Sequence, residues 1–216
     1  AHEIKNPLAS MRSAIESLPR VEDPVLRREL TEIATHDVRR IDRLVSEISD
    51  ASRIDSEMSR ATLEKIDIAE LVRAIIGSRQ QRAASLTHRI DLQTHGFPAI
   101  VMGVGARLER VLENLLDNEI SISPPDAPIE VTVDNDGTCV TLAVSDHGPG
   151  IPEDAREKVF QRFHSIRPEK EDFGNHSGLG LAIARTIAEA HDGTLSAKAR
   201  LDGQPGARMR LRLPSA

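Results

Sequence analysis

The chain opens with a narrow stripe of apolar residues at helical spacing. These residues recur at intervals of three and four positions, which predicts a first helix whose apolar face is only about 80° wide. They are Ile4, Leu8, Met11, Ile15 and Leu18. The segment PRVEDP then interrupts the pattern, and within it Asp23 and Pro24 suit the N-cap and the first position of a second helix. Apolar residues continue at helical spacing after it, with no Gly or Pro before Gly77.

Two such helices joined by a short turn cannot bury both of their apolar stripes against each other. A second copy of the hairpin would complete a four-helix bundle. The pattern therefore predicts that residues 1–63 form a helical hairpin that assembles as a homodimer.

From about Ile66 the pattern becomes mixed. It predicts helices over 66–84, 106–120 and 178–193, the last with Gly193 as its C′ residue, and strands over 88–96, 129–134 and 138–146 with a closing hairpin over 194–214. The run Asn135-Asp136-Gly137 suits a tight turn between two of these strands. The predicted class is α+β, with helices on an antiparallel-rich sheet, and residues 61–67 are expected to act as a hinge.

Composition excludes several classes of protein. The 28 basic and 34 acidic residues are interspersed, so no basic stripe indicates nucleic-acid binding. The sequence has no long apolar run and no signal-peptide pattern. We therefore expect no membrane span, no membrane contact and no export. A single cysteine, Cys139, excludes an internal disulfide and is typical of a reducing compartment; its neighbours TCVTLAV predict a buried strand position.

Two glycine loops are candidates for ligand binding. In SDHGPGIP, Gly148 and Gly150 form a tight loop behind a strand that ends at Asp146, although a plain Pro-Gly turn explains this motif equally well. In HSGLGLAIA, Gly178 and Gly180 precede a helix N-terminus, where exposed N–H groups favour phosphate. Each signal is weak alone, and together they favour a nucleotide.

The amphipathic helix LERVLENLLDNEI adds a third element. Asn114 and Asn118 lie four residues apart on one flank of it. An amide oxygen there can bind Mg²⁺ held on phosphates, while the alternative is a pair of ordinary surface amides.

Taken together, these segments resemble the catalytic core of a bacterial sensor histidine kinase of a two-component system. AHEIKNPLAS resembles the H box, LENLLDNEI the N box, DHGPGIP the G1 box, VFQRF the F box and SGLGLAIA the G2 box, in the family's order and spacing. The resemblance covers essentially all 216 residues. It implies a dimerisation and histidine phosphotransfer hairpin over 1–63 and, over 64–216, an α/β sandwich ATP-binding domain of the GHKL (Bergerat) type, shared with gyrase, Hsp90 and MutL.

The resemblance also implies a function and partners. It indicates an ATP-dependent protein histidine kinase that uses ATP and Mg²⁺, autophosphorylates, and passes the phosphoryl group to an aspartate in the receiver domain of a response regulator, with phosphatase activity toward that regulator. The chain would be the cytoplasmic catalytic portion of an inner-membrane sensor. The alternative is a dimeric pseudokinase that binds nucleotide weakly and acts as a scaffold for the regulator.

The resemblance implies a role in nucleotide binding for individual residues of the boxes. Asp146 would accept from the adenine amino group, with Gly148 and Gly150 shaping that wall. Asn118 would hold Mg²⁺, and Asn114 would lie near the phosphates.

The remaining boxes would surround the triphosphate. Phe160 and Phe163 would anchor a mobile lid over residues 153–177. The backbone of the G2 box would meet the phosphates, through Gly178, Leu179 and Gly180.

His2 would be the phosphoacceptor. A neutral imidazole, with a reference pKa of about 6.5, is nucleophilic at one nitrogen, and Glu3 could hold the other N–H. On a helical wheel His2 lies opposite the apolar stripe and near Asn6, which the resemblance links to regulator dephosphorylation. Without the resemblance, Asn6 and Pro7 suit the start of a helix and would leave His2 in a frayed entry; the resemblance places Pro7 inside a longer helix.

The family's hydrolases use a glutamate one helical turn before the metal-binding asparagine to activate water. That position is Asn114 here, and Glu113 points about 100° away, so direct ATP hydrolysis is disfavoured.

Several residues depart from the family pattern. Glu119 stands where alanine is usual and is expected to repel and crowd the triphosphate. Val104 replaces a usual aspartate, Ser121 and Ser165 replace frequent basic residues, and His176 replaces the first glycine of the G2 box. The expected result is weaker nucleotide affinity than is typical of the family.

Overall fold

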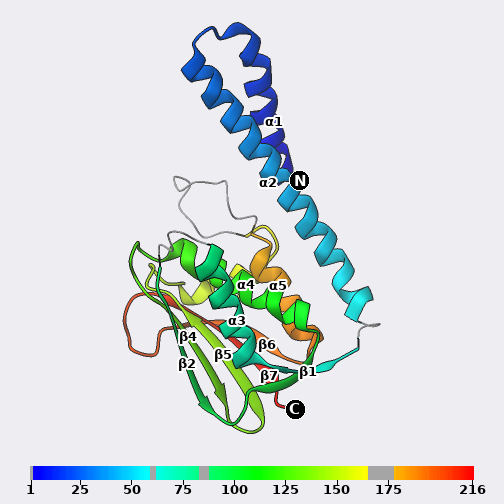
Figure 1. Ribbon diagram of the computed structural model, residues 1–216, viewed down its shortest axis with the longest axis vertical. Helices are drawn as coiled ribbons and strands as arrows, with labels where there is room; N and C mark the ends of the chain where they lie inside the picture. Colours follow the sequence, from blue (N-terminus) through cyan, green and yellow to red (C-terminus); the bar gives the residue numbers. More distant parts are fainter. Residues whose placement is uncertain (1, 59–61, 83–87, 165–177) are drawn as a thin grey trace.

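The computed structural model describes residues 2–58, 62–82, 88–164 and 178–216, and for His2, Glu3, Arg82 and several residues between 40 and 58 it describes the backbone alone. A long helical hairpin projects from a part in which helices cover a sheet (Figure 1). None of the described helices is both long and apolar enough to cross a bilayer.

The hairpin consists of α1 (His2–Ser17), a 3₁₀ turn (Leu18–Arg20) and α2 (Pro24–Met58). Asp23 Oδ1 accepts a hydrogen bond from the N–H of Val25 at 2.9 Å, which confirms Asp23 as the N-cap and Pro24 as the first helical residue. Pro7 lies inside α1, so the alternative in which the helix begins at Pro7 is wrong.

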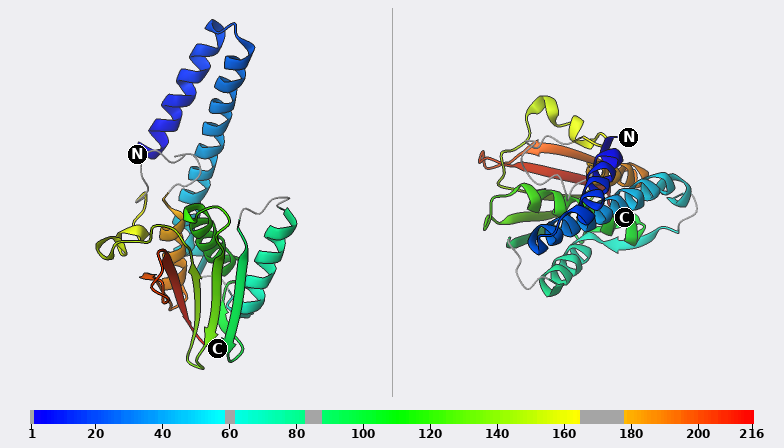
Figure 2. Two further views of the ribbon diagram at one scale, coloured as in Figure 1. Left: turned by 90° about the vertical axis from the view of Figure 1, so that its left-hand side faces the viewer. Right: turned by 90° about the horizontal axis from the view of Figure 1, so that it is seen from above.

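The apolar stripe of the hairpin is only partly covered. Ala14 and Leu44 are buried, whereas Leu8 and Ile15 are 44% and 52% exposed. The lower part of α2 runs beside α5 in both figures and contacts it (Figure 2). Exposed apolar side chains also follow α2, at Val25, Leu26, Ile33, Val38 and Val45. A single copy of the chain thus leaves apolar side chains exposed along the hairpin.

The second part is a twisted sheet with helices on one face. Its elements are β1 (Glu64–Asp67), α3 (Ile68–Arg82), β2 (Ile90–Gly96), β3 (Ile100–Gly103), α4 (Gly105–Ile122), β4 (Ile129–Asn135), β5 (Cys139–Ser145), two 3₁₀ turns (Glu153–Ala155 and Lys158–Phe160), α5 (Gly180–Ala190), β6 (Thr194–Ala199) and β7 (Ala207–Pro214). The main sheet has the order β2-β4-β5-β7-β6, in which β2 is parallel to β4 and the other pairs are antiparallel. β1 and β3 form a separate antiparallel pair.

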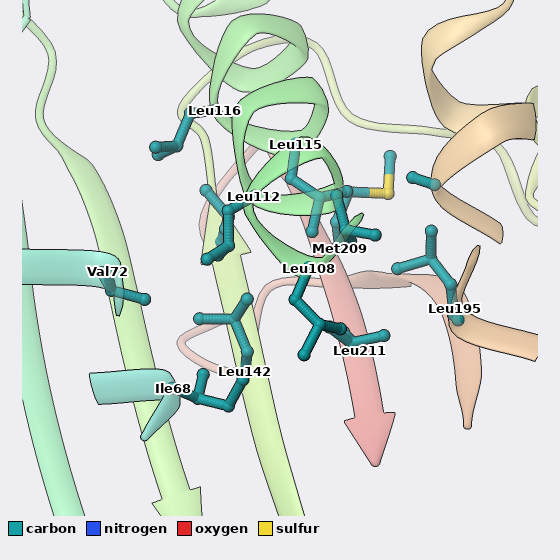
Figure 3. Close-up of a cluster of buried hydrophobic side chains, with 14 of the residues drawn as sticks. Ile68, Val72, Leu108, Leu112, Leu115, Leu116, Leu142, Leu195, Met209 and Leu211 are labelled. Carbon is teal, nitrogen blue, oxygen red and sulfur yellow. The ribbon is translucent and has the colours of Figure 1, made fainter. Parts of the chain in front are cut away.

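Alternation along the strands builds the core. Every second residue of β4 and β7 is buried, and the residues between them are polar on the opposite face. The apolar flank of α4 lies over the buried face of the sheet and packs with Leu142, Met209 and Leu211 (Figure 3). Its members are Leu108, Val111, Leu112, Leu115 and Leu116. The predicted α+β class, with helices on an antiparallel-rich sheet, is confirmed.

The sequence pattern missed two short strands. Glu64–Asp67 forms β1, opposite β3, so the predicted hinge over 61–67 is wrong for these four residues. The expected helix over 66–84 accordingly begins two residues later, where Asp67 Oδ1 accepts from the N–H groups of Ala69 and Glu70. Strands of four residues are too short to show alternation, and the partner strand is more than thirty residues away.

The end of α5 also differs from the prediction. The left-handed residue is Asp192, with φ of 54°, and not Gly193. Gly193 is needed for a different reason, because a Cβ there would lie 2.4 Å from the carbonyl oxygen of Arg212. Because β7 approaches so closely, only a glycine fits at position 193. The left-handed conformation falls at position 192, where an aspartate tolerates it.

The N-terminus of α4 lacks a side-chain cap. Val104 is its N-cap residue, in an extended conformation (φ −103°, ψ 110°), and its side chain makes no capping hydrogen bond. We expect Val104→Asp to raise the free energy of unfolding by about 1 kcal/mol, because a carboxylate can accept from the free N–H groups of the first turn. Urea unfolding would measure this, with Val104→Ala as the control that adds no acceptor. Equal stabilities of the Asp and Ala variants would contradict the prediction.

Candidate nucleotide and phosphotransfer sites

One flank of α4 brings the two glycine loops together. Asn114, Asn118 and Ile122 are spaced four apart, so they follow one side of the helix over about 12 Å. A Cβ on Gly180 would lie 3.4 Å from Asn114 Oδ1, and a Cβ on Gly148 would lie 2.6 Å from the carbonyl oxygen of Ile122. The G2 and G1 segments therefore meet α4 at opposite ends of the same flank, as the motifs predict.

The end of this α4 flank near Asn114 suits phosphate. Gly180 is the first residue of α5, so the N-terminus of this helix lies beside Asn114. The buried Nδ2 of Asn114 has no hydrogen-bond partner among the described residues, which leaves a donor available there. Gly178 has φ of 68°, while Leu179 is 1% exposed and belongs to the core. Leu179 can thus contribute its backbone to a ligand, but not its side chain.

The other end of this α4 flank is built around Asp146. This residue is fully buried, its Oδ1 accepts from the N–H of Gly148, and its Oδ2 accepts from the N–H of Ala207 at 2.9 Å. Gly150 follows with φ of 78°, close against the backbone of Gly206. The G1 loop is consequently fixed by backbone hydrogen bonds to β7.

The side chain of Arg200 stabilises the G1 loop, a role that the sequence motifs did not predict. Its Nη1 donates to the carbonyl oxygen of Asp146 at 2.9 Å, and its Nη2 donates to Glu130 and Asp202 at 3.0 and 2.6 Å. The hydrogen bonds from Arg200 lower the pKa of Asp202 to about 2. Because the partner Asp146 lies 54 positions away, no local pattern marks this arginine.

Glu119 lies near Asp146, at the G1 end of this flank of the helix. Its side chain is fully buried, and its Oε1 accepts from Nδ2 of Asn118 at 2.9 Å. Burial raises the pKa of Glu119 well above its ordinary value, and the neighbouring carboxyl group of Asp146 raises it further. The side chain lies about 100° around the helix from Asn118, among the buried residues of α4, and the effect of Glu119 on the triphosphate stays a prediction.

The Asn118 amide fits the metal role. Its Nδ2 donates to Glu119, so Oδ1 is the atom left for a metal. Mg²⁺ takes few ligands from the protein and keeps phosphate oxygens and waters, so one amide oxygen is an adequate contribution. Among the described residues no cluster of three or more His, Cys, Asp or Glu side chains offers an alternative metal site.

The two phenylalanines of the F box differ in burial and in their contacts. Phe160 is buried, with the Arg185 guanidinium carbon 5.0 Å from its ring centroid. Phe163 is 42% exposed, and its N–H donates to the carbonyl oxygen of Gly178 at 3.0 Å. Part of the predicted lid over 153–177 lies outside the described residues, and Ser165 and His176 lie outside them altogether.

The predicted phosphoacceptor group lies on the hairpin. His2 and Glu3 are in the first turn of α1, and their side chains fall outside the description. Asn6 is exposed and follows His2 by four residues, so the two share one face of the helix. A surface recess elsewhere on the hairpin contains none of the predicted site residues; it is lined by Arg27, Arg28, Thr31, Glu32, Thr35, His36 and Arg39 of α2.

Two family models match the chain. The His Kinase A (phospho-acceptor) domain matches residues 1–57, and the histidine kinase-, DNA gyrase B-, and HSP90-like ATPase matches residues 103–216. The chain belongs to the sensor histidine kinases. The family recognised from the five boxes is thereby confirmed.

Relatives and solved structures agree with this family. The sensor protein ChvG of Rhizobium meliloti is 42% identical over 227 residues, covering all of this chain and 39% of that protein, and the sensor protein kinase PmrB of Pseudomonas aeruginosa is 29% identical, covering 94% and 42%. The chain thus spans about two fifths of these histidine kinases. The structure of histidine kinase ThkA in complex with response regulator protein TrrA matches with a TM-score of 0.79 at 25% identity, covering all of this chain and 60% of that one. The ATP-binding domain of PrrB from Mycobacterium tuberculosis matches with a TM-score of 0.54 at 26% identity, covering 72% of this chain and 99% of that one.

Proposed function

We propose that this chain uses ATP to phosphorylate a histidine and passes the phosphoryl group to an aspartate of a response regulator. The observation that carries the proposal is the convergence on one flank of α4 of Asn114, Asn118, Asp146 and the first residue of α5, Gly180. A helix N-terminus beside one amide, then a second amide, then an acceptor carboxylate match a nucleotide laid along the helix.

Each residue would have a defined role toward the nucleotide. Asp146 would accept from the amino group of the base, while the N-terminus of α5 and Asn114 would bind phosphate oxygens. Asn118 Oδ1 would hold Mg²⁺, which when bound neutralises charge on the phosphates. Asn114 is an amide and cannot serve as a base for water, so this arrangement favours transfer to a side chain over hydrolysis.

His2 would be that side chain. A ring nitrogen would attack the γ-phosphorus while the bond to the bridging oxygen of ADP breaks, so ADP leaves and phosphohistidine forms. Glu3 would hold the proton on the other ring nitrogen and stabilise the positive charge that develops there.

The hairpin would provide the partner surfaces. We propose that residues 1–63 form the dimerisation and phosphotransfer unit and 64–216 the catalytic unit, and that the exposed apolar face of α1 and α2 is covered by a second copy. ThkA was solved with its response regulator, which supports a receiver domain as the partner of this chain. We place the whole assembly on the cytoplasmic side of a membrane sensor.

A scaffold that binds nucleotide poorly is the second candidate, favoured by the buried Glu119 beside Asp146. Incubation of the purified protein with γ-labelled ATP and Mg²⁺ separates the two. A protein-bound label that is labile in acid and stable in base marks a histidine kinase, and no label on the full-length protein favours the scaffold.

Asn6 is expected to act in the reverse reaction. We predict that Asn6→Ala lowers dephosphorylation of the regulator at least about tenfold and leaves autophosphorylation within about twofold, because the exposed amide positions water without touching ATP. Decay of the phosphorylated regulator and initial rates of labelling measure the two activities. An unchanged rate of dephosphorylation would falsify this role.

A further inference from the structure

One peptide group in the G1 loop is held at both of its ends. It joins Asp146 to His147, directly after β5. Its carbonyl oxygen accepts from Nη1 of Arg200 at 2.9 Å, and its N–H donates to Oγ of Ser123 at 3.2 Å. Arg200 follows β6 and Ser123 ends α4, so the two contacts come from different elements. The orientation of this peptide is therefore fixed by the packing of elements around the loop.

The same peptide lies inside the turn that orients the carboxyl group of Asp146. Oδ1 of Asp146 accepts from the N–H of Gly148, which closes a turn around the peptide between residues 146 and 147. Oδ2 accepts from the N–H of Ala207 at 2.9 Å. A rotation of the peptide would strain the first of these bonds and turn the carboxyl group. The position of the carbonyl oxygen thus controls the position of the side-chain oxygens.

Arg200 is buried although its charged partners are not. Its side chain is 3% exposed, while those of Glu130 and Asp202 are 43% and 46% exposed. Half-exposed carboxylates are solvated without an ion pair, so they gain little from a buried guanidinium. The fully buried group that Arg200 contacts is the carbonyl oxygen of Asp146. A buried acceptor without a donor is costly, so this carbonyl accounts best for the buried guanidinium.

The glycine at position 206 makes room for this contact. Gly206 has φ of 131°, and a Cβ there would run into the carbonyl oxygen of Asp146 and lie 2.8 Å from Cδ of Arg200. The connection between β6 and β7 is thus shaped to bring the guanidinium against the G1 loop.

We propose that Arg200 is a positioning residue for base recognition, which holds the peptide after Asp146 so that the carboxyl group is oriented to accept from the amino group of a base. This role rests on the proposed function, in which Asp146 receives that amino group. Arg200 acts through Asp146 and makes no contact of its own with the nucleotide. The phosphate-binding residues, Asn114 and the N-terminus of α5, lie at the other end of the α4 flank and should bind phosphate independently of Arg200.

Calorimetric titration with three ligands separates the base from the phosphates. They are Mg·ADP, Mg·inosine diphosphate, in which an oxygen replaces the amino group of the base, and Mg·pyrophosphate. We expect the unsubstituted chain to prefer Mg·ADP over Mg·inosine diphosphate at least about tenfold, because that oxygen cannot donate to Asp146. Arg200→Met should reduce the preference to within about twofold, by weakening Mg·ADP alone. Glu130 and Asp202 stay solvated in this variant, so the fold should persist.

Two further variants sharpen the test. Arg89→Ala removes an exposed arginine that pairs with Asp91 of β2, and it should change none of the three affinities. Arg200→Lys keeps the positive charge but has one donor group in place of the planar fork, so its preference should fall between those of the unsubstituted chain and Arg200→Met. A lysine variant with the full preference would show that charge alone suffices, and the positioning role would be wrong. Should Arg200→Met fail to fold, Arg200→Lys carries the test alone.

A purely structural role would lower all three affinities together in Arg200→Met, and this result would overturn the proposal. Equal binding of Mg·ADP and Mg·inosine diphosphate by the unsubstituted chain would overturn it too, because Asp146 would then not read the amino group. A full preference for Mg·ADP in Arg200→Met removes the role of Arg200 and leaves the proposed function standing. If the unsubstituted chain binds none of the three ligands, the nucleotide site itself falls, and the role of Arg200 with it.

Discussion

Replacing His2 by glutamine is expected to abolish the acid-labile phosphoryl label, lowering it by more than about a hundredfold. The lone pair of an amide nitrogen is delocalised into the carbonyl group, so glutamine offers no nucleophile to the γ-phosphorus. Glutamine is also a good helix former, and α1 should therefore keep its structure around Pro7. The affinity for Mg·ADP should not change, because the predicted nucleotide residues lie on α4, α5 and the G1 loop.

The hairpin supplies a matched control for this experiment. His36, on α2, is the other histidine of residues 1–63, and its Nδ1 lies 3.8 Å from Asp37. His36→Gln should retain the label at the level of the unsubstituted protein. A label that survives in His2→Gln and disappears in His36→Gln would assign the phosphoacceptor to α2 instead.

The parts of the fold that could be predicted were those with long, regular patterns. The hairpin, the start of α2 at Pro24 and the turn after Asn135 follow from periodicity, capping and turn chemistry within a few neighbouring residues. β1 and β3 could not be predicted, because each has four residues and gains its stability from pairing with the other. Gly193 was recognised as special for the wrong reason, since its close contact comes from β7.

In the candidate site, too, local patterns were predictable and contacts between distant elements were not. The motifs predicted which residues gather on α4, because their spacing alone places Asn114 and Asn118 on one flank. They could not predict which neighbours complete the site. Arg200 holds Asp146 from a distant turn, and His191 accepts from the N–H of Val104 at 3.1 Å while its Nδ1 lies 2.7 Å from the carbonyl oxygen of Ile187, joining the ends of α4 and α5. Such contacts depend on how separate elements pack, which local sequence patterns do not encode.

The buried carboxyl group of Glu119 should make the stability of the protein fall as pH rises. In the folded protein its pKa is raised well above the ordinary value of 4.5, chiefly by burial. Below about pH 4.5 the group is protonated in both the folded and unfolded states and has no effect. Between pH 4.5 and the folded-state pKa, the unfolded chain releases this proton and the folded chain keeps it. The free energy of unfolding then falls by up to about 1.4 kcal/mol for each pH unit, since the folded state binds more protons.

Glu119→Gln removes this titration and keeps the shape of the side chain. We therefore expect the variant to be more stable than the unsubstituted protein at pH 7 to 8 and to lose most of that advantage at pH 5, in urea unfolding measured with EDTA and without nucleotide. Glu109→Gln removes an exposed carboxylate from the same helix, and its difference from the unsubstituted protein should not vary with pH in this way. Parallel stability curves for Glu119→Gln and the unsubstituted protein would show that the folded chain holds no extra proton there. A widening gap would instead mean that Glu119, beside Asp146, lowers the stability of the fold at neutral pH, as a buried carboxyl group without a complete set of hydrogen bonds must.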